Sequence, residues 1–230
     1  MKIHLSLMAC GIVFSTLCNA QVHDTAKAAF DSTYHNYLYD SRLAYFKGLP
    51  DTKDEIIFLG NSITHWGDWA ELTGNSHVRN RGIAGDISYG ILARMDEVLS
   101  SKPAKIFLMI GVNDIGRKIP LELTLQNYRR ILAMVKSVSP HTRLYIQSVL
   151  PINESIINRD YYTGTNAEIR TMNAAVKALA VEQQITFINL YDLLADKDGQ
   201  MPAAYTYDGI HLTAAAYIRW TNYLRQQRYL

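Results

Sequence analysis

Two short polar segments carry the residue types that acyl transfer needs. Ser62 follows Gly60 and Asn61, and Asp208 precedes His211 by three residues near the C-terminus. A serine hydroxyl is a weak nucleophile at neutral pH unless a base lies within hydrogen-bond reach, about 2.6–3.2 Å. His211 can be that base, while Asp208 can fix its tautomer and stabilise the imidazolium. This set predicts attack of Ser62 on a carbonyl carbon, followed by hydrolysis with water that His211 activates.

Two further polar segments can supply donors for the oxyanion that acyl transfer creates. They are residues 80–86, which include Gly85, and residues 111–114, which include Asn113. Three of the four segments also have an ordinary structural explanation. A Gly-Asn-Ser sequence is a common helix start, Asn and Asp are common in turns, and an Asp or a His near a helix end is often a capping or surface group. Their placement on the fold therefore decides whether they are catalytic.

Three other side chains compete for these roles. His65 follows Ser62 by three residues and is an alternative base, but no acid is placed to orient it. We predict that Asp86 is the N-cap of a helix that begins near Ile87. Asp114 is predicted to be a turn residue. His211 is the preferred base because Asp208 accompanies it.

Several other classes of function find no support in the sequence. Ser62 is not surrounded by the Gly-x-Ser-x-Gly elbow of α/β-hydrolases. Neither a Gly-x-Gly-x-x-Gly loop nor a Walker loop follows a strand, and the seven histidines show no metal-ligand spacing. With 23 basic and 21 acidic side chains and no Lys/Arg-rich run, nucleic-acid binding is not indicated. We expect no cofactor and no catalytic metal.

Short apolar runs rich in β-branched residues recur along the chain and precede most of the polar segments. Such runs are typical of parallel strands that are buried on both faces. Apolar residues at helical spacing lie between them, as at positions 121–135, and Thr165 with Glu168 forms a capping box. Thr213 can cap a last helix. The predicted strands are 56–59, 77–80, 106–110, 144–150 and 185–190, and further helices are predicted at 24–47 and 87–99.

Strands that alternate with helices imply a doubly wound parallel sheet with helices on both faces. We predict an α/β fold with three αβα layers and a five-stranded parallel sheet of the flavodoxin-like type. In such sheets, ligands bind beyond the carboxyl ends of the strands. The four polar segments should therefore open onto one edge of the sheet.

Residues 1–20 have the pattern of a secretory signal peptide. Lys2 is followed by an apolar run at 5–17 and by small residues up to Ala20. An uncleaved anchor is the alternative, but the run is shorter than the roughly 20 residues that a spanning helix needs. We expect cleavage near Ala20 and export to the periplasm or beyond, with no membrane span in the mature chain. The rest divides into an N-terminal helical segment at 21–50 and a catalytic domain at 51–230.

Both cysteines, Cys10 and Cys18, lie within this leader. The mature chain is therefore expected to have no disulfide, no cysteine nucleophile and no thiolate metal site. Residues 7–10 faintly resemble a lipoprotein cleavage box, but they lie too close to the start of the chain.

Taken in their order along the chain, the four polar segments resemble the four blocks of the SGNH hydrolases, also called the GDSL esterase/lipase family. The resemblance covers about 55–224, nearly the whole mature chain. Asn61 and Ile63 stand where the family's name motif has Asp and Leu. Neither position carries the chemistry, so these departures concern the branch of the family and not the mechanism. The matching residues are 60–63, 80–86, 111–114 and 208–211.

The resemblance implies a role for one or two residues in each block. Ser62 would be the nucleophile, with Asp208 and His211 as the other members of the triad. The oxyanion would be bound by the backbone N–H groups of Ser62 and Gly85 and by the side-chain amide of Asn113. A glycine suits the second of these roles because its backbone can approach the substrate closely.

The family as a whole cleaves acyl esters of sugars, lipids and small molecules. The chain is similar to platelet-activating-factor-type acetylhydrolases and to bacterial carbohydrate acetylesterases. Four aromatic residues near the catalytic segments can stack on a sugar ring or simply pack: Trp66, Trp69, Tyr205 and Tyr207. We therefore expect a carbohydrate O-acetylesterase that acts on glycans such as acetylated sialic acid or plant polysaccharide. The alternatives are a lysophospholipase or short-chain lipase, and a glycan-binding module without turnover.

Overall fold

The computed structural model describes residues 30–230 of the chain, and its centre is a wholly parallel five-stranded sheet. The strand order is β2-β1-β3-β4-β5, and β1 pairs with β2 on one side and with the central strand β3 on the other. This confirms the predicted flavodoxin-like sheet. The strands are β1 (Ile56–Gly60), β2 (Val78–Gly82), β3 (Lys105–Met109), β4 (Arg143–Gln147) and β5 (Thr186–Ile188).

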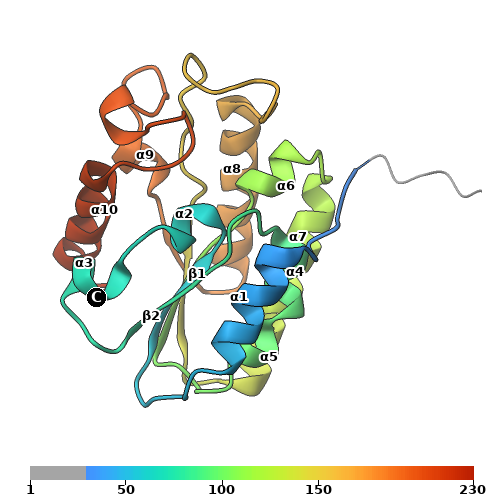
Figure 1. Cartoon of the computed structure of the whole chain (residues 1–230), viewed down its shortest axis with the longest axis vertical. Coiled ribbons are helices and arrows are strands. Elements are labelled where there is room, and N and C mark those ends of the chain that lie inside the picture. The colour runs from blue at the N-terminus through green and yellow to red at the C-terminus, as the bar shows by residue number, and fades with distance from the viewer. Residues whose placement is uncertain (1–29) are drawn as a thin grey trace, which may run out of the picture.

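Helices cover both faces of this sheet (Figure 1). One layer contains α3 (Trp69–Thr73) and α10 (Ala214–Gln226), which contact each other. The opposite layer contains α4 (Ser88–Ala93), α7 (Leu121–Val138) and α8 (Asn166–Glu182). The connection from β1 to β2 runs over the first face and the later ones over the second, as right-handed crossovers require when the strand order reverses at β1. The remaining helices are α1 (Tyr37–Lys47), α2 (Ser62–His65), α5 (Met95–Val98), α6 (Val112–Gly116) and α9 (Tyr191–Leu194).

Aromatic rings form a row across the sheet on the α3 and α10 side. Phe58, Phe107 and Tyr145 are register partners on β1, β3 and β4, and their rings stack with centroids 4.9 and 4.7 Å apart. Trp69 from α3 stacks on Phe58 at 4.0 Å and is 1% exposed. Trp220 from α10 meets Trp69 edge to face at 4.7 Å. The row anchors α3 and α10 on this face of the sheet.

Two predicted helices differ from the observed ones. Within the described residues the first helix begins only at Tyr37, where Asn36 accepts a hydrogen bond from the backbone N–H of Tyr39. The predicted helix at 87–99 is divided into α4 and α5 at Arg94, whose guanidinium is buried and bonded to Asp86. The predicted signal peptide at 1–20 lies outside the described residues. Within residues 30–230, no helix combines the length and apolar character needed to cross a bilayer.

Of the two predicted threonine caps, Thr165 caps its helix and Thr213 does not. The capping box is confirmed, because Thr165 Oγ1 accepts from the N–H of Glu168 and the Glu168 carboxylate accepts from the N–H of Thr165. Thr213 does precede α10, but its hydroxyl donates to the carbonyl of Ala204 and makes no cap hydrogen bond. The Ala204 carbonyl, in the loop before α10, takes up this hydroxyl. A sequence pattern does not show that the loop folds back to this position.

Candidate active site

The predicted site segments meet at the carboxyl edge of the sheet. Ser62 follows β1, Gly85 follows β2 and Asn113 follows β3, the three neighbouring strands around the point where the strand order reverses. The loop before α10 brings Asp208 and His211 to the same place, 149 residues beyond Ser62 in the case of His211. Ligand sites of open α/β sheets lie at this kind of switch point.

Ser62 is the first residue of α2 and is 7% exposed. The side chain of Asn61 caps this helix by accepting a hydrogen bond at 3.0 Å from the N–H of Ile63. Tyr217 of α10 donates to the carbonyl of Ile63 at 2.7 Å, which ties α2 to α10. Asn61, which departs from the family motif, thus has a structural role. Both contacts hold the serine rigidly at the end of β1.

Ser62, His211 and Asp208 form a hydrogen-bonded chain. Ser62 Oγ lies 2.9 Å from His211 Nε2, and His211 Nδ1 lies 2.6 Å from Asp208 Oδ2. Asp208 Oδ1 accepts from the backbone N–H groups of Ile210 and His211 at 2.9 and 2.7 Å. Gly209, with φ of +93°, makes the tight turn between acid and base possible. This geometry leaves Nδ1 as donor to the carboxylate and Nε2 as acceptor toward the hydroxyl.

The charge state of Asp208 suits this arrangement. Partial burial alone would raise the pKa of its carboxyl. The hydrogen bonds from the His211 side chain and from the two backbone N–H groups outweigh burial, and they hold the pKa below its usual value. Asp208 is therefore ionised at neutral pH and can stabilise a positive charge on His211.

Three backbone or amide donors lie in the segments that follow β1, β2 and β3. Within residues 30–230, the N–H groups of Ser62 and Gly85 donate no hydrogen bond to the protein. Asn113 Nδ2 donates one of its two protons to the carbonyl of Asp86 at 2.8 Å, which leaves the other proton for a ligand. Gly85 has φ of +80° in a turn closed by the bond from Asp86 N–H to the carbonyl of Ile83 at 3.1 Å. Unused donors of this kind fit an oxyanion.

The alternative base, His65, occupies a different place. Its Nδ1 accepts a hydrogen bond at 3.1 Å from the backbone N–H of Ala84, while the histidine in contact with Ser62 is His211. Burial, with a smaller contribution from the charge of Arg42, lowers the pKa of His65 to about 4. His65 is therefore neutral at physiological pH.

Asp86 is not the helix cap that was predicted. Its carboxylate is fully buried and pairs with the equally buried Arg94, whose Nε and Nη2 lie 3.1 and 3.0 Å from Oδ2. Arg94 also donates to the carbonyl of Gly60 at 3.1 Å, so the pair joins the end of β1 to the turn that holds Gly85. Burial raises the pKa of Asp86 to about 6, against the opposing effect of Arg94. A helix cap stays near solvent, whereas this side chain lies beneath the site.

Asp114 also differs from its predicted role as a turn residue. It lies within α6, and its buried carboxylate accepts from the N–H of Ser88 at 3.1–3.2 Å and from Thr124 Oγ1 at 3.3 Å. Burial raises the pKa of Asp114. The carboxylate links α4, α6 and α7 behind Asn113, and so it supports the helix that carries the amide donor.

Arg94 is a supporting residue that the sequence reasoning missed, although a signal was present. Ile87, Ile91, Arg94 and Val98 lie at helical spacing on one apolar face. A charged residue on such a face needs a buried partner, because an unpaired buried charge is strongly unfavourable. Asp86, one residue before this face begins, is that partner.

The four aromatic residues near the site fall into two pairs. Trp66 and Tyr207 are 53% and 62% exposed and stack on His65 and His211 with ring centroids 4.3 and 5.9 Å apart. Trp69 is a core residue, and Tyr205 is half-buried beneath the guanidinium of Arg219. Only the first pair can offer a ring face to a ligand beside the triad.

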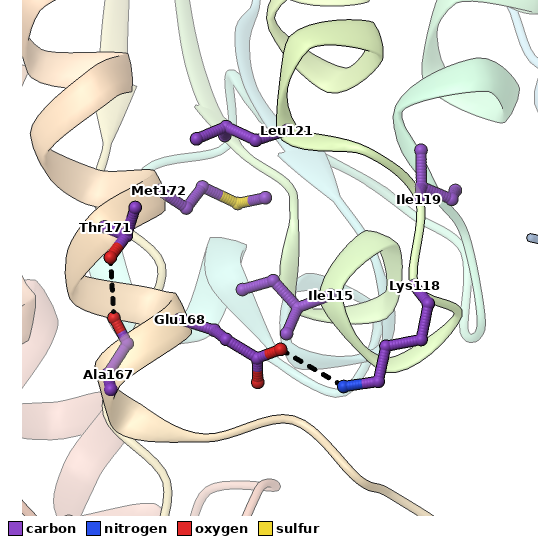
Figure 2. Close-up of a pocket in the computed structure, with 8 residues that line it drawn as sticks. All are labelled: Ile115, Lys118, Ile119, Leu121, Ala167, Glu168, Thr171 and Met172. Atoms are coloured by element: carbon purple, nitrogen blue, oxygen red, sulfur yellow. Dashed lines mark hydrogen bonds and ion pairs between the residues drawn. The ribbon is translucent and has the colours of Figure 1, made fainter.

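Two cavities lie near these elements. A groove of about 490 Å³ is lined among others by Trp66, Asp68 and Leu212, the residue after His211. A second, largely apolar pocket of about 380 Å³ lies between α6 and α8 (Figure 2). Ile115 and Met172 point into it, and two further lining residues, Lys118 and Glu168, form an ion pair at 3.1 Å (Figure 2). Ile115 is two residues beyond Asn113 on α6, so the two side chains leave this helix on different sides.

Known proteins resemble the chain over most of its length. A family model described as the GDSL-like Lipase/Acylhydrolase family matches residues 58–219, a range that includes all four polar segments. The GDSL esterase/lipase WDL1 of Oryza sativa subsp. japonica is 26% identical over 184 residues, which cover 68% of this chain and 70% of that protein. The platelet-activating factor acetylhydrolase IB subunit alpha1 of Bos taurus is 24% identical over 193 residues, with 81% and 76% covered.

A solved structure shares this fold. A Streptococcus pneumonia protein, provisionally described as a platelet activating factor, is 31% identical and superposes with a TM-score of 0.77. The match covers 83% of this chain and 92% of that one. The sheet and its flanking helices are therefore shared with a protein of similar sequence.

Proposed function

The chain belongs to the GDSL-like lipase/acylhydrolase family and is an ester-hydrolysing enzyme, and we propose that it removes short acyl groups, foremost acetyl, from carbohydrate hydroxyls. The observation that carries the proposal is the chain of contacts from Ser62 Oγ to His211 Nε2 at 2.9 Å and from His211 Nδ1 to Asp208 at 2.6 Å. A nucleophile, a base and an orienting acid in this order are the parts of a serine hydrolase.

In the proposed reaction, Ser62 Oγ attacks the ester carbonyl carbon while His211 Nε2 takes the hydroxyl proton. The carbonyl oxygen becomes an oxyanion, which the N–H groups of Ser62 and Gly85 and the amide of Asn113 can bind. His211 then gives its proton to the leaving alcohol as the ester C–O bond breaks, and an acyl-Ser62 ester remains. Water that His211 deprotonates cleaves this ester, and the proton returns to Ser62.

The direction of proton transfer places the alcohol part of the substrate. Because His211 protonates the leaving oxygen, the alcohol must lie on the His211 side of the scissile bond. Tyr207 and the groove beside Leu212 lie on that side, and the exposed indole of Trp66 forms part of the groove. A sugar ring has an apolar face that can stack on such rings, and hydroxyls that can donate to the carboxylate of Asp68. These features support a carbohydrate alcohol.

An acetyl group is supported by two further observations. The Bos taurus relative is named an acetylhydrolase. None of the residues that line the apolar pocket of Ile115 and Met172 belongs to the triad or adjoins a triad residue in the sequence, whereas Leu212 of the groove follows His211. A long acyl chain on Ser62 would therefore not enter it directly. The same relative's name favours a second candidate, the acetyl ester of a lipid alcohol.

The proposal is tested with p-nitrophenyl acetate, butyrate and octanoate, followed by acetylated xylan and O-acetylated sialic acid. We expect kcat/KM to fall with acyl length and acetate to be released from at least one glycan. Faster cleavage of the octanoate ester, with both glycans untouched, would contradict the carbohydrate acetylesterase and favour a lipase. An acetylated ether phospholipid as a further substrate distinguishes the second candidate.

Replacing Trp66 by alanine is expected to separate the glycan from the small ester. Loss of a stacking ring should raise KM for an acetylated xylo-oligosaccharide about tenfold, which corresponds to roughly 1.4 kcal/mol. The kcat/KM for p-nitrophenyl acetate, which lacks the sugar, should change little. Tyr37→Ala is the matched control, because Tyr37 is 90% exposed on α1, away from the groove. Equal losses on both substrates would argue against a sugar subsite at Trp66.

We further propose that the enzyme is exported with cleavage near Ala20. The support is the charged start, apolar run and small residues of positions 1–20. N-terminal sequencing of the protein from the extracytoplasmic fraction should begin at Gln21. An intact N-terminus there would contradict cleavage.

A further inference from the structure

We infer that His65 is a positioning residue for the proposed reaction, because its ring holds the turn 83–86 and thereby aims the N–H of Gly85 at the oxyanion. The inference rests on the proposed function, in which Gly85 is an oxyanion donor. His65 itself would touch neither the substrate nor the reacting atoms. It would act through one hydrogen bond, from the N–H of Ala84 to its Nδ1 at 3.1 Å.

This hydrogen bond requires a particular form of the His65 ring. Nδ1 can accept a proton only when it carries none, so the ring must be neutral with its proton on Nε2. Burial, with a smaller effect from Arg42, lowers the pKa of His65 to about 4 and keeps the ring neutral at physiological pH. The acceptor is therefore present throughout the pH range in which a serine esterase works.

His65 is itself held on the same short helix as the nucleophile. It is the last residue of α2, three residues after Ser62, and its N–H donates to the carbonyl of Asn61 at 2.8 Å. Its carbonyl accepts from Asn80 Nδ2 at 3.0 Å. A Cβ on Gly82 would collide with the backbone of His65, so α2 lies directly on the end of β2. The ring is thus a rigid link between nucleophile and turn.

The turn needs such a link because glycine makes it easy to distort. A bond between the first and fourth residues, with φ of +80° at the third, is the geometry of a type II turn. The Gly85 N–H belongs to the central peptide of this turn, so a shift of the preceding peptide, which carries the Ala84 N–H, would move the Gly85 N–H relative to Ser62. Glycine tolerates a wide range of backbone conformations, so its own backbone does not prevent the shift.

Contacts on the far side of the turn do not replace the His65 bond. Arg117 Nη2 donates to the carbonyl of Gly85 at 3.1 Å, and Asn113 donates to the carbonyl of Asp86 at 2.8 Å. Both contacts hold the peptide groups that follow Gly85. In the described part of the chain, the N–H of Ala84, which precedes Gly85, is bonded only to His65. His65 therefore controls the peptide that leads into the donor.

The test compares His65→Asn with His65→Leu. Asparagine can place its Oδ1 where Nδ1 stood, while leucine has the same branching at Cγ and no acceptor. Active sites are counted by titration with a serine-reactive phosphonate, and kcat and KM are then measured with p-nitrophenyl acetate. We expect His65→Leu to lose about 10- to 100-fold in kcat with KM within twofold, somewhat less than the deletion of an oxyanion donor. His65→Asn should stay within about threefold of the wild type.

A purely structural role would give a different pattern. It would lower the melting temperature and the number of titrated sites, but it would leave kcat per active site the same in both variants, and that result would overturn the inference. The inhibition constant of a trifluoromethyl ketone, which forms an oxyanion on the serine, should rise in His65→Leu by the same factor as kcat falls. If His65→Leu does not fold, His65→Gln replaces it. The longer side chain of glutamine displaces the amide oxygen by one methylene from the position of Nδ1, so it should not accept the hydrogen bond from Ala84.

The same experiment distinguishes failure of the inference from failure of the proposed function. Ser62→Ala is measured in parallel. An inactive Ser62→Ala with a fully active His65→Leu overturns only the role of His65. Activity that survives in Ser62→Ala would remove the proposed mechanism, and the role of His65 with it.

Discussion

Ser62→Ala and His211→Ala should each lower kcat for p-nitrophenyl acetate by about 10⁴- to 10⁶-fold, and the double variant should lower it no further. The reason is that the hydroxyl and the imidazole act as one unit, joined at 2.9 Å. Without Ser62 there is no acyl-enzyme, and without His211 the hydroxyl keeps its proton and remains a poor nucleophile. Either loss therefore removes the same step. The measurement is steady-state kcat for the four proteins.

Two exposed residues supply matched controls for these variants. Ser76→Ala and His141→Ala remove the same atoms at exposed positions outside the site and should keep wild-type kcat. Losses that multiply in the double variant would mean that the two side chains act independently, against the proposed triad. A fall in His65→Ala as large as in His211→Ala would return His65 to consideration as the base.

Arg94→Met is expected to lower the free energy of unfolding by about 3–5 kcal/mol. Arg94 and Asp86 are both fully buried, and removal of one partner leaves an unpaired charge in the interior. Replacing both residues by apolar ones, as in Asp86→Leu/Arg94→Met, should recover much of the loss, since no charge then remains buried. Denaturant unfolding of the three proteins at pH 7 tests this. Arg129→Met, which breaks an exposed ion pair with Glu182, should cause no measurable change.

The Arg94→Met variant should also respond differently to pH. Burial already raises the pKa of Asp86 to about 6, although the charge of Arg94 opposes this rise. Without Arg94, the pKa of Asp86 in the folded protein should be higher still. In the unfolded chain, the carboxyl releases its proton near pH 4. Above that pH the folded variant binds the proton and the unfolded chain does not, so stability must fall as pH rises.

In the wild type, the fall in stability that Asp86 causes ends near pH 6, where its carboxyl is ionised in the folded state as well. In Arg94→Met the fall should continue to higher pH. Melting temperatures at pH 5 and pH 8 should therefore diverge more in the variant. An Arg94→Met protein whose stability relative to the wild type improved as pH rose would contradict the assignment of Asp86 as its unpaired partner.

The position of the buried pair connects stability with the site. Arg94 reaches the carbonyl of Gly60 just before the nucleophile segment, and Asp86 ends the turn that carries Gly85. The carbonyl of Asp86 also receives the amide of Asn113. One ion pair thus lies behind the three segments that would bind the oxyanion.

The sequence alone determined the architecture and the edge of the sheet at which the chemistry should occur. Buried parallel strands leave continuous apolar runs, and amphipathic helices leave a 3.6-residue period, so both are visible without coordinates. The carboxyl ends of parallel strands meet at one edge, so segments that follow successive strands must lie together. From that rule alone, the segments that contain Ser62, Gly85 and Asn113 are expected in one region of the fold.

Only the tertiary structure decided which of several similar side chains face the site. Trp66 and Trp69 are three residues apart, yet one is exposed beside the triad and the other stacks on Phe58 in the core. His65 is close to Ser62 in sequence, but it is bonded to Ala84. The histidine that contacts Ser62 is His211, from a loop 149 residues further along the chain. Local spacing cannot distinguish these cases, because the direction of a side chain depends on how its short helix packs on the sheet.

The buried polar contacts were likewise decided by packing. Asp86 and Asp114 have the sequence context of a cap and a turn, and nothing local distinguishes them from exposed carboxylates. Their partners, among them Arg94 and Ser88, come from neighbouring helices whose closeness depends on the crossovers between strands. A buried carboxylate is stable only where such donors converge, and that convergence is a property of the folded chain as a whole.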